Sequence, residues 1–225
     1  MKARSSQQMK PTTNGGPNPK AVGAFAAGLV LLYLVVSSST PSVSTVALPS
    51  GCPKSGRRYA IMMDGGSTGS RVHVYPFDDH NGRVTLAEET FVQLKPGLSS
   101  FADEPEKAAE SLLPLLAAAV KTVPKELHKC TPIQLKATAG LRLLGAAKST
   151  AILNAVHKLF KKYDFVVSSD AVVLMDGRDE GAFAWATVNF LLGAITPRPE
   201  RSTTAAVFDM GGASTQVVFK PGTDA

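Results

Sequence analysis

One long apolar segment stands out near the start of the chain. Residues 21–36 (AVGAFAAGLVLLYLVV) carry no charge, and Ser37–Ser39 extend the uncharged run to nineteen positions. At a rise of about 1.5 Å per residue, a helix of this length spans about 28 Å, close to the thickness of a bilayer core. Four basic residues precede the segment, so the positive-inside rule predicts a cytosolic N-terminus and a lumenal remainder. We expect an uncleaved type II membrane anchor at 21–39, with a cleaved signal peptide as the alternative.

The segments on either side of this predicted anchor are polar. Residues 1–20 are rich in Pro, Gly, Ser and Asn, which predicts a disordered cytosolic tail. Residues 40–57 are rich in Ser, Thr, Pro and Val and are interpreted as a stalk. Beyond the stalk we expect a first α/β lobe at 58–200 and the start of a second lobe at 201–225.

From residue 58 onward, apolar residues recur with the two-residue period of strands or the 3.6-residue period of helices. Strands are predicted at Tyr59–Asp64, Arg71–Phe77, Val84–Leu94, Ile133–Thr138, Phe165–Val167, Val172–Leu174, Ala205–Asp209 and Thr215–Phe219. Helices are predicted at Pro105–Val123, Ala146–Tyr163 and Glu180–Leu192. The order of three strands, then alternating helices and strands, then a hairpin is typical of an α/β domain followed by the beginning of another.

The net charge of +6 suggests at first sight a partner such as nucleic acid. Seven Lys and Arg residues and no acidic residue precede Tyr59, whereas 17 Lys and Arg and 18 Asp and Glu residues follow from there. The predicted folded part is therefore close to neutral. Because it has no basic face with interleaved aromatic residues, we expect no nucleic-acid partner.

The chain has two cysteines, Cys52 and Cys130. They are too few and too far apart for a zinc-binding motif. Both lie on the same side of the predicted anchor, so a single disulfide in an oxidising lumen is one interpretation. Two unpaired thiols are the other, and the sequence leaves both open.

Two segments far apart in the chain share one design. In AIMMDGGSTGSR and AVFDMGGASTQ, a buried strand ends in an aspartate, Asp64 or Asp209, and a small-residue turn leads into an outgoing strand. The turn residues of the first segment are Gly66, Ser67, Thr68, Gly69, Ser70 and Arg71. Those of the second segment are Gly211, Gly212, Ala213 and Ser214. Neither segment has the Gly-Lys-Ser/Thr of a P-loop.

This design suits phosphate binding. Glycines let the backbone approach an anion closely, and successive N–H groups then form an anion-binding concavity. A carboxylate at the strand end can hold a hydrated divalent cation that neutralises the phosphate. Either loop alone is also compatible with an ordinary hairpin turn. Two such loops 145 positions apart favour two lobes that clamp phosphates, and this arrangement resembles the actin, Hsp70 and sugar-kinase superfamily, with its RNase H-like fold.

Two further blocks lie between the loops. KATAGLRLL, beginning at Lys136, predicts a strand end and a turn into a helix, and its alternative interpretation is a simple connection. DGRDEGAFAWATVNFLLG, beginning at Asp176, places Glu180 at a predicted helix start. There a carboxylate is either a favourable partner of the helix dipole or a general base that takes a proton from water.

Taken together, these blocks resemble a known enzyme family. The strings DGGSTGSR, ATAGLRLL, DEGAFAWATVNFLLG and DMGGASTQ are similar, in order and spacing, to four of the five conserved regions of the apyrases, the nucleoside triphosphate diphosphohydrolases. The resemblance covers about Tyr59–Phe219, and its departures, such as Gly65 in place of the usual Ala, are conservative. It implies hydrolysis of nucleoside di- and triphosphates to lower phosphates and phosphate, in a Golgi or other secretory lumen.

The resemblance implies binding roles for the matching residues. Asp64 and Asp209 would hold a divalent cation, Ca²⁺ or Mg²⁺, through its water shell. The loops Gly66–Arg71 and Gly211–Ser214 would cradle the phosphates, and Thr138 would contact the terminal phosphate.

The resemblance also implies the catalytic roles. Glu180 would be the base that activates the attacking water, and Ser214 and Gln216 would help to position that water. No covalent nucleophile is required, and Arg142 and Trp185 are interpreted as structural support. This agrees with phosphoryl transfer in general, which depends mostly on positioning and charge neutralisation.

The chain ends at Ala225, shortly after the second loop. The fifth region and most of the second lobe, which the resemblance implies would supply the nucleoside-base pocket, lie beyond it. Because both lobes are needed to exclude water from the phosphates, we expect little or no activity from this exact polypeptide. The alternatives to an apyrase are an exopolyphosphatase-like phosphohydrolase, against which Thr68 and Gln216 argue, and an inactive membrane-anchored fragment.

Overall fold

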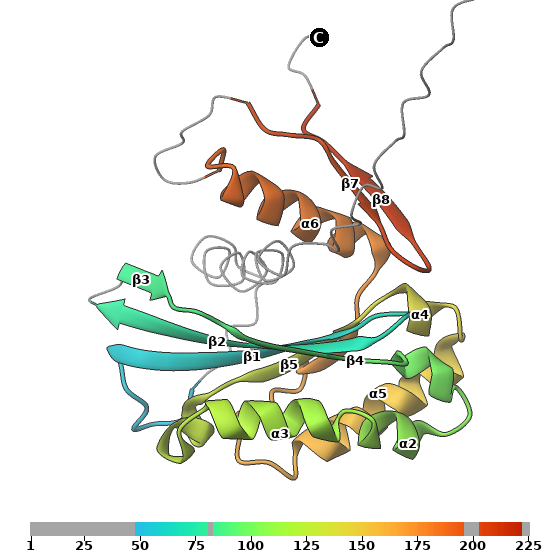
Figure 1. Ribbon diagram of the computed structural model, residues 1–225. Coiled ribbons are helices and arrows are strands. Elements are labelled where there is room, and N and C mark those ends of the chain that lie inside the picture. Colours follow the sequence, from blue (N-terminus) through green and yellow to red (C-terminus); the bar gives the residue numbers. More distant parts are fainter. Residues whose placement is uncertain (1–47, 81–82, 196–202, 222–225) are drawn as a thin grey trace, which may run out of the picture.

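The computed structural model describes residues 48–80, 83–195 and 203–221, and shows an α/β protein with a main sheet and a smaller one (Figure 1). The predicted tail at 1–20 and anchor at 21–39 lie outside the described residues, as do residues 40–47 of the predicted stalk. No helix in the described ranges is long and apolar enough to cross a membrane.

The main sheet has six strands. They are β1 (Gly56–Gly65), β2 (Ser70–His80), β3 (Arg83–Leu86), β4 (Thr90–Leu94), β5 (Ile133–Ala137) and β6 (Val172–Leu174). Their order is β3-β2-β1-β5-β6, with β4 also paired to β2. The β1–β5 and β5–β6 pairs are parallel, and the others are antiparallel.

The helices are η1 (Leu98–Phe101), α2 (Pro105–Glu110), α3 (Leu113–Thr122), η2 (Lys125–Cys130), α4 (Ala139–Arg142), α5 (Ala146–Phe160) and α6 (Gly177–Leu191). Helices α2, α3 and α5 cover one face of the main sheet (Figure 1). The apolar stripe predicted for α5 is confirmed, because Ile152, Val156 and Phe160 are fully buried in the core. This burial contributes to the hydrophobic core that the helices form with the main sheet.

The single strand predicted at Val84–Leu94 is wrong, because the structure has two separate strands there, β3 and β4. Strand β3 pairs with one end of β2 and β4 with the other, both in the same antiparallel direction. Between them, Glu89 turns its carboxylate to His73 on β2, with Oε2 2.9 Å from the Nδ1 atom. The gap lies opposite Pro76 of β2, whose carbonyl accepts from the Ala87 N–H at 2.9 Å. Proline has no N–H to return a ladder hydrogen bond, so the pairing is interrupted there.

The single helix predicted at Pro105–Val123 is also wrong, because the structure has two helices with a break between Glu110 and Leu113. Pro114 lies in the first turn of α3. Proline has no N–H to donate and is best accommodated at a helix start, so it begins a new helix and does not interrupt an old one. The short strand predicted at Phe165–Val167 is only an isolated bridge between Val166 and Pro132.

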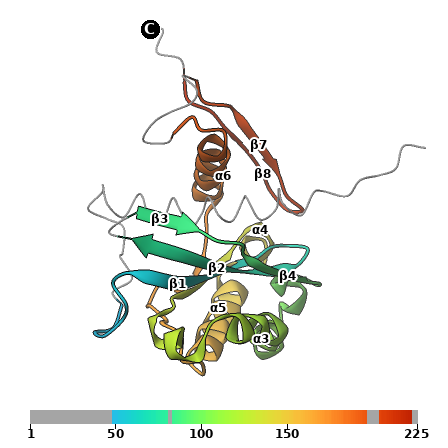
Figure 2. The same ribbon diagram turned by 60° about the vertical axis from the view of Figure 1, so that its left-hand side comes forward.

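The second sheet is the antiparallel hairpin of β7 (Val207–Met210) and β8 (Thr215–Val218). Helix α6 packs against this hairpin, on the side of the main sheet opposite α3 and α5 (Figures 1 and 2). A Cβ atom at Gly181 of α6 would lie 2.8 Å from Cγ2 of Val218, so the packing leaves no room for a side chain there. Asn189 also exchanges two hydrogen bonds with the backbone of Ala205.

The structure joins the two cysteines. Cys52 and Cys130 form a disulfide with their Cα atoms 5.5 Å apart, which decides between the two interpretations of the sequence. The bridge ties the segment before β1 to the end of η2, just ahead of β5.

Candidate active site

The side chains that face away from the helix-covered core come from alternate positions of the central strands. On β1, Ile61 and Met63 are buried in the core, so Asp64 projects from the opposite face. On β5 the same alternation buries Leu135 and turns Lys136 to that face. Asp64 and Lys136 are register partners of the parallel β1–β5 pair and therefore lie side by side.

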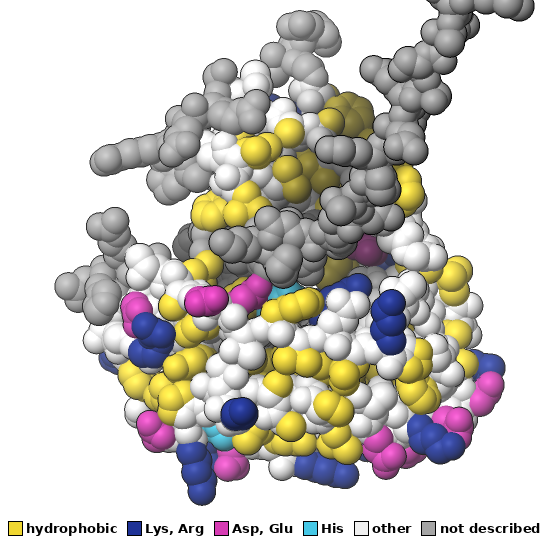
Figure 3. Space-filling model, viewed as in Figure 1, with side chains coloured by type: hydrophobic (Ala, Val, Ile, Leu, Met, Phe, Trp, Pro, Cys, Tyr) yellow, Lys and Arg dark blue, Asp and Glu magenta, His cyan; other side chains and the backbone are white. Residues whose placement is uncertain are grey.

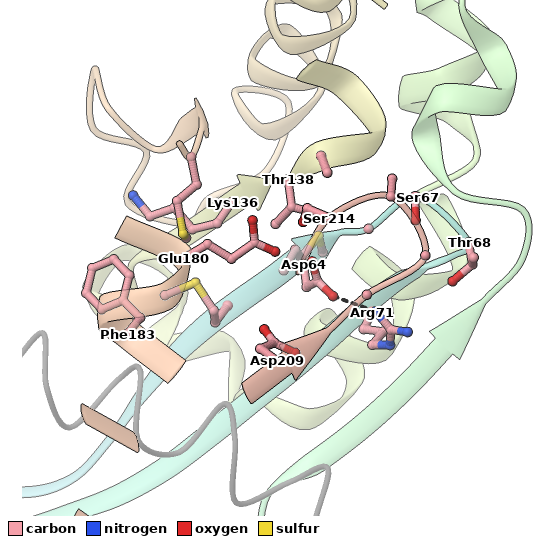
Figure 4. Close-up of a pocket in the computed structure, with 18 of the residues that line it drawn as sticks. Asp64, Ser67, Thr68, Arg71, Lys136, Thr138, Glu180, Phe183, Asp209 and Ser214 are labelled. Carbon is pink, nitrogen blue, oxygen red and sulfur yellow. Dashed lines mark hydrogen bonds and ion pairs between the residues drawn. The ribbon is translucent and has the colours of Figure 1, made fainter. Parts of the chain in front are cut away.

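A cleft of about 600 Å³ lies between this face of the main sheet and the layer of α6 and the β7–β8 hairpin (Figure 4). Most of the residues that the sequence singled out line it, although they come from four separate parts of the chain. They are Asp64, Gly66, Ser67, Thr68, Arg71, Thr138, Glu180, Asp209, Gly211, Gly212, Ala213 and Ser214. Gly69, Ser70 and Gln216 are not among the lining residues.

The first loop is held from behind by close backbone contacts. A Cβ atom at Gly97, just before η1, would lie 2.3 Å from the carbonyl oxygen of Gly66. A Cβ atom at Gly140 of α4 would lie 2.7 Å from Cα of Ser67, and Ser99 Oγ donates to the Ser67 carbonyl at 3.4 Å. These contacts keep the first loop close to the end of β1 and leave it no space to move away from the cleft.

Replacing Gly97 with alanine is expected to distort the first loop. The added methyl group clashes with two backbone oxygens, those of Gly66 and Ser67, which cannot rotate away as a side chain would. Overpacking of this kind costs about 1–3 kcal/mol. Chemical denaturation of the whole chain measures the loss. Gly145→Ala is a poor control because Gly145 has a positive φ, whereas Gly211→Ala meets no atom closer than 3.3 Å and is expected to be milder.

The second loop approaches the first directly. A Cβ atom at Gly212 would lie 2.7 Å from Oγ of Ser67 and 2.9 Å from Cγ2 of Thr68. The small residue therefore lets the two Gly/Ser/Thr loops face each other across the end of the cleft (Figure 4). The sequence alone could not predict this contact between the loops, because the contact depends on how α6 positions the β7–β8 hairpin.

The surroundings of Asp64 shift the pKa of its carboxyl upward. Desolvation by the surrounding protein raises the pKa of Asp64, and the neighbouring charge of Asp209 raises it further. Arg71 acts in the opposite direction, since its Nη1 donates to Asp64 Oδ2 at 2.5 Å. A cation placed between Asp64 and Asp209 would relieve the same repulsion.

Glu180 lies in the first turn of α6, which begins at Gly177. The N-cap is Asp176, whose Oδ1 accepts from the N–H of Asp179 at 2.7 Å. Glu180 is therefore not needed as the cap, and its carboxylate points into the cleft toward Asp64 and Thr138 (Figure 4).

A short network surrounds the Glu180 carboxylate. Arg142 Nη2 donates to Glu180 Oε2 at 2.9 Å, and Gln216 Nε2 lies 3.4 Å from the same oxygen. Gln216 Nε2 also donates to Ser214 Oγ at 2.9 Å. Gln216 is buried behind the second loop, so it contacts the cleft through Glu180 and Ser214. Ser70 is buried as well, and a Cβ atom at Gly69 would clash with the Leu94 carbonyl, so these two residues of the first loop pack against β4 and do not line the cleft.

Several lining residues were not selected from the sequence. The main ones are His73, Lys136, Met175 and Phe183. Burial lowers the pKa of the Lys136 ammonium, and the carboxylates of Asp170 and Asp179 act in the opposite direction. Lys136 stands in one of the quoted motifs, two positions before Thr138, and strand alternation next to Asp64 is the signal that could have identified it.

The described surface fits the near-neutral charge predicted for the folded part. On the face shown in Figure 3, Lys and Arg side chains are interspersed with Asp and Glu side chains and do not gather into a basic stripe. The fold and the site thus define an α/β protein with a cleft between two Gly/Ser/Thr loops, each preceded by an aspartate.

The model of the GDA1/CD39 (nucleoside phosphatase) family matches residues 52–225, and the chain belongs to this family. The guanosine-diphosphatase of Candida albicans is 56% identical over 165 residues, which are 72% of this chain and 27% of that protein. The guanosine-diphosphatase of Saccharomyces cerevisiae is 55% identical over 166 residues, 73% of this chain and 32% of that protein. Ectonucleoside triphosphate diphosphohydrolase 5 of Gallus gallus is 45% identical over 206 residues, 85% of this chain and 48% of that protein.

The chain thus spans between about a quarter and a half of the length of these relatives. Among solved structures, nucleoside triphosphate hydrolases from Neospora caninum resemble it with a TM-score of 0.52 and 19% identity. That likeness covers 92% of this chain and 44% of the other, and it supports the α/β fold alone.

Proposed function

We propose that this chain carries the phosphate-binding and base-bearing part of a nucleoside phosphate hydrolase, which cleaves nucleoside di- and triphosphates at the terminal phosphoric anhydride. The observation that carries the proposal is the meeting of Asp64, Asp209 and Glu180 with two Gly/Ser/Thr loops in one cleft. The names of the fungal relatives, guanosine-diphosphatase, favour a diphosphate substrate.

The residues of the cleft fit a divalent cation. Asp64 and Asp209 are carboxylates, the donors that Ca²⁺ and Mg²⁺ prefer. Two carboxylates are too few to fill a coordination shell, so the proposal has them hold the cation through bound water. The cation would supply charge neutralisation of the phosphates.

The chain's own residues supply the other parts of the reaction. The residues of the loops Gly66–Arg71 and Gly211–Ser214 that line the cleft bind phosphate oxygens, with Thr138 at the terminal phosphate. Glu180 takes a proton from the attacking water, and Ser214 and Gln216 orient that water. For Gln216 the orientation is indirect, since it lies behind the second loop and donates to Ser214.

We also propose the arrangement in which this site works. The main sheet and its helices would form an RNase H-like first lobe at 58–200, as in the actin and Hsp70 superfamily, and 201–225 would begin a second lobe. A type II anchor at 21–39 would hold the globular part in a Golgi or other secretory lumen. The Cys52–Cys130 disulfide supports a lumenal site, because structural disulfides are typical of oxidising compartments.

The test is release of phosphate from GDP, UDP, ADP, ATP and polyphosphate by the purified 225-residue chain. The chain is kept in excess over the nucleotide so that even slow hydrolysis can be measured. We expect slow but measurable release from nucleotides with Mg²⁺ or Ca²⁺, in line with the low activity expected of this polypeptide, and none from polyphosphate. A folded sample that releases no phosphate from any nucleotide would contradict the proposal.

Removal of the metal is expected to abolish this release. Adding EDTA in excess withdraws the cation that the proposal assigns to Asp64 and Asp209, and adding back Mg²⁺ or Ca²⁺ restores the rate. Comparing the two metals at equal free concentration identifies the preferred ion. A rate unaffected by EDTA would exclude a metal-assisted reaction, and thermal melting in EDTA shows whether the fold is retained.

A further inference from the structure

Arg142 joins the main sheet to the helix that carries Glu180. It is the last residue of α4, and only 23% of its side chain is exposed. Its Nη1 donates to the Met175 carbonyl at 2.5 Å, and its Nη2 donates to Glu180 Oε2 at 2.9 Å. Met175 is itself fixed to the main sheet, since its N–H donates to the Ala137 carbonyl at 2.8 Å.

The contact engages one oxygen of the Glu180 carboxylate. Oε2 accepts from Arg142 and lies 3.4 Å from Gln216 Nε2. Within the described part of the chain, Oε1 takes part in no hydrogen bond or ion pair. Glu180 lines the cleft, whereas Arg142 is not among the residues that line it.

From this geometry we infer that Arg142 is a positioning residue for the reaction, which fixes Glu180 through Oε2 and leaves Oε1 to accept the proton of the attacking water. The inference rests on the proposed function. A glutamate side chain has three rotatable bonds, and a charge-assisted hydrogen bond from a planar guanidinium restricts them strongly. Because the guanidinium is held by Met175, its position follows the main sheet that also carries Asp64.

This role predicts a particular kinetic pattern. Arg142 is outside the cleft lining, so its loss should leave nucleotide affinity nearly unchanged and lower the rate of the chemical step. A misplacement of a catalytic group by about 1 Å can lower a rate by about 100-fold. We expect Arg142→Met, which keeps an unbranched apolar stem, to lower kcat by about 10- to 100-fold with KM changed less than about twofold.

The experiment compares the unsubstituted chain with Arg142→Met, Arg142→Lys, Glu180→Gln and the double variant Arg142→Met with Glu180→Gln. Arg142→Lys keeps the positive charge and should recover part of the rate. In the Glu180→Gln background, Arg142→Met should add no further loss, because the base that it positions is already absent. Arg178→Met is the control, since Arg178 is exposed and on the same helix.

Two outcomes would overturn the inference. One is an equal loss from Arg142→Met with and without Glu180, and the other is a change confined to KM. The ¹⁵N NMR signals of the guanidinium give a readout independent of activity. Restricted Arg142 Nη signals that become mobile in Glu180→Ala establish the Arg142–Glu180 contact whether or not the chain hydrolyses nucleotides, so a failure of the proposed function is distinguished from a failure of the contact. Mobile signals in the unsubstituted chain contradict the inference.

Discussion

Replacing Glu180 with glutamine is expected to lower phosphate release by about 10²- to 10⁴-fold, the range typical of a lost general base. Glutamine has nearly the same shape and can still accept a hydrogen bond from Arg142, but it cannot take a proton from water. The cleft and the phosphate loops are unchanged, so nucleotide binding should persist. Single-turnover phosphate release measures the rate.

The matched control is Asp179→Asn. Asp179 precedes Glu180 on α6, is exposed, and is not among the residues that line the cleft. The chain contains one tryptophan, Trp185, on the same helix, so its fluorescence reports whether each variant is folded. Equal rates for Glu180→Gln and the unsubstituted chain would remove Glu180 from the mechanism. Equal losses in both variants would point to a general effect of charge on α6.

Removing the disulfide is expected to produce the largest loss of stability. Cys52 and Cys130 are 78 positions apart, and the closed loop contains β1 through β4 together with α2 and α3. In the chain-entropy model a loop of this size contributes about 4.5 kcal/mol, and removal of native disulfides from small domains typically costs about 2–5 kcal/mol. The double variant Cys52→Ala with Cys130→Ala should therefore unfold at a much lower urea concentration.

Reduction of the unsubstituted chain by dithiothreitol is the control, because it breaks the same bond without changing a side chain. Both measurements should give the same free energy of unfolding. If neither differs from the oxidised chain, the loop is already constrained in the unfolded state. The disulfide would then contribute little to the free energy of unfolding. It would still support a lumenal location, because structural disulfides are typical of oxidising compartments.

Much of the site could be predicted from the sequence because its motifs are local. A strand that ends in Asp, followed by Gly, Ser and Thr, predicts a phosphate-binding turn at Asp64 and again at Asp209, and both aspartates line the cleft. The sequence also predicts a helix start near Glu180, and the structure shows that Asp176 is the N-cap of this helix. The roles of these residues in catalysis stay predictions until they are measured.

The errors have physical causes that lie outside the local pattern. The strand break before β4 lies opposite Pro76 of β2, which has no N–H to donate to the ladder and is 11 positions from Ala87. The break between α2 and α3 depends on Pro114, whose effect on a helix depends on whether it falls in the first turn. Ser70 has the residue type of a phosphate ligand, yet the β2 pairing buries it behind the loop.

By itself, the sequence determined the α/β class, the order of most strands and helices, and the two turns of Gly, Ser and Thr that each follow an aspartate, because these follow from short-range periodicity and turn chemistry. Only the tertiary structure decided that Cys52 and Cys130 are bonded and that Lys136 lies beside Asp64. It also decided that Arg142 is paired with Glu180, 38 positions away. Such contacts depend on strand register and on the packing of α6 against β7 and β8. No local pattern encodes these interactions, because they form between segments that meet only when the whole chain has folded.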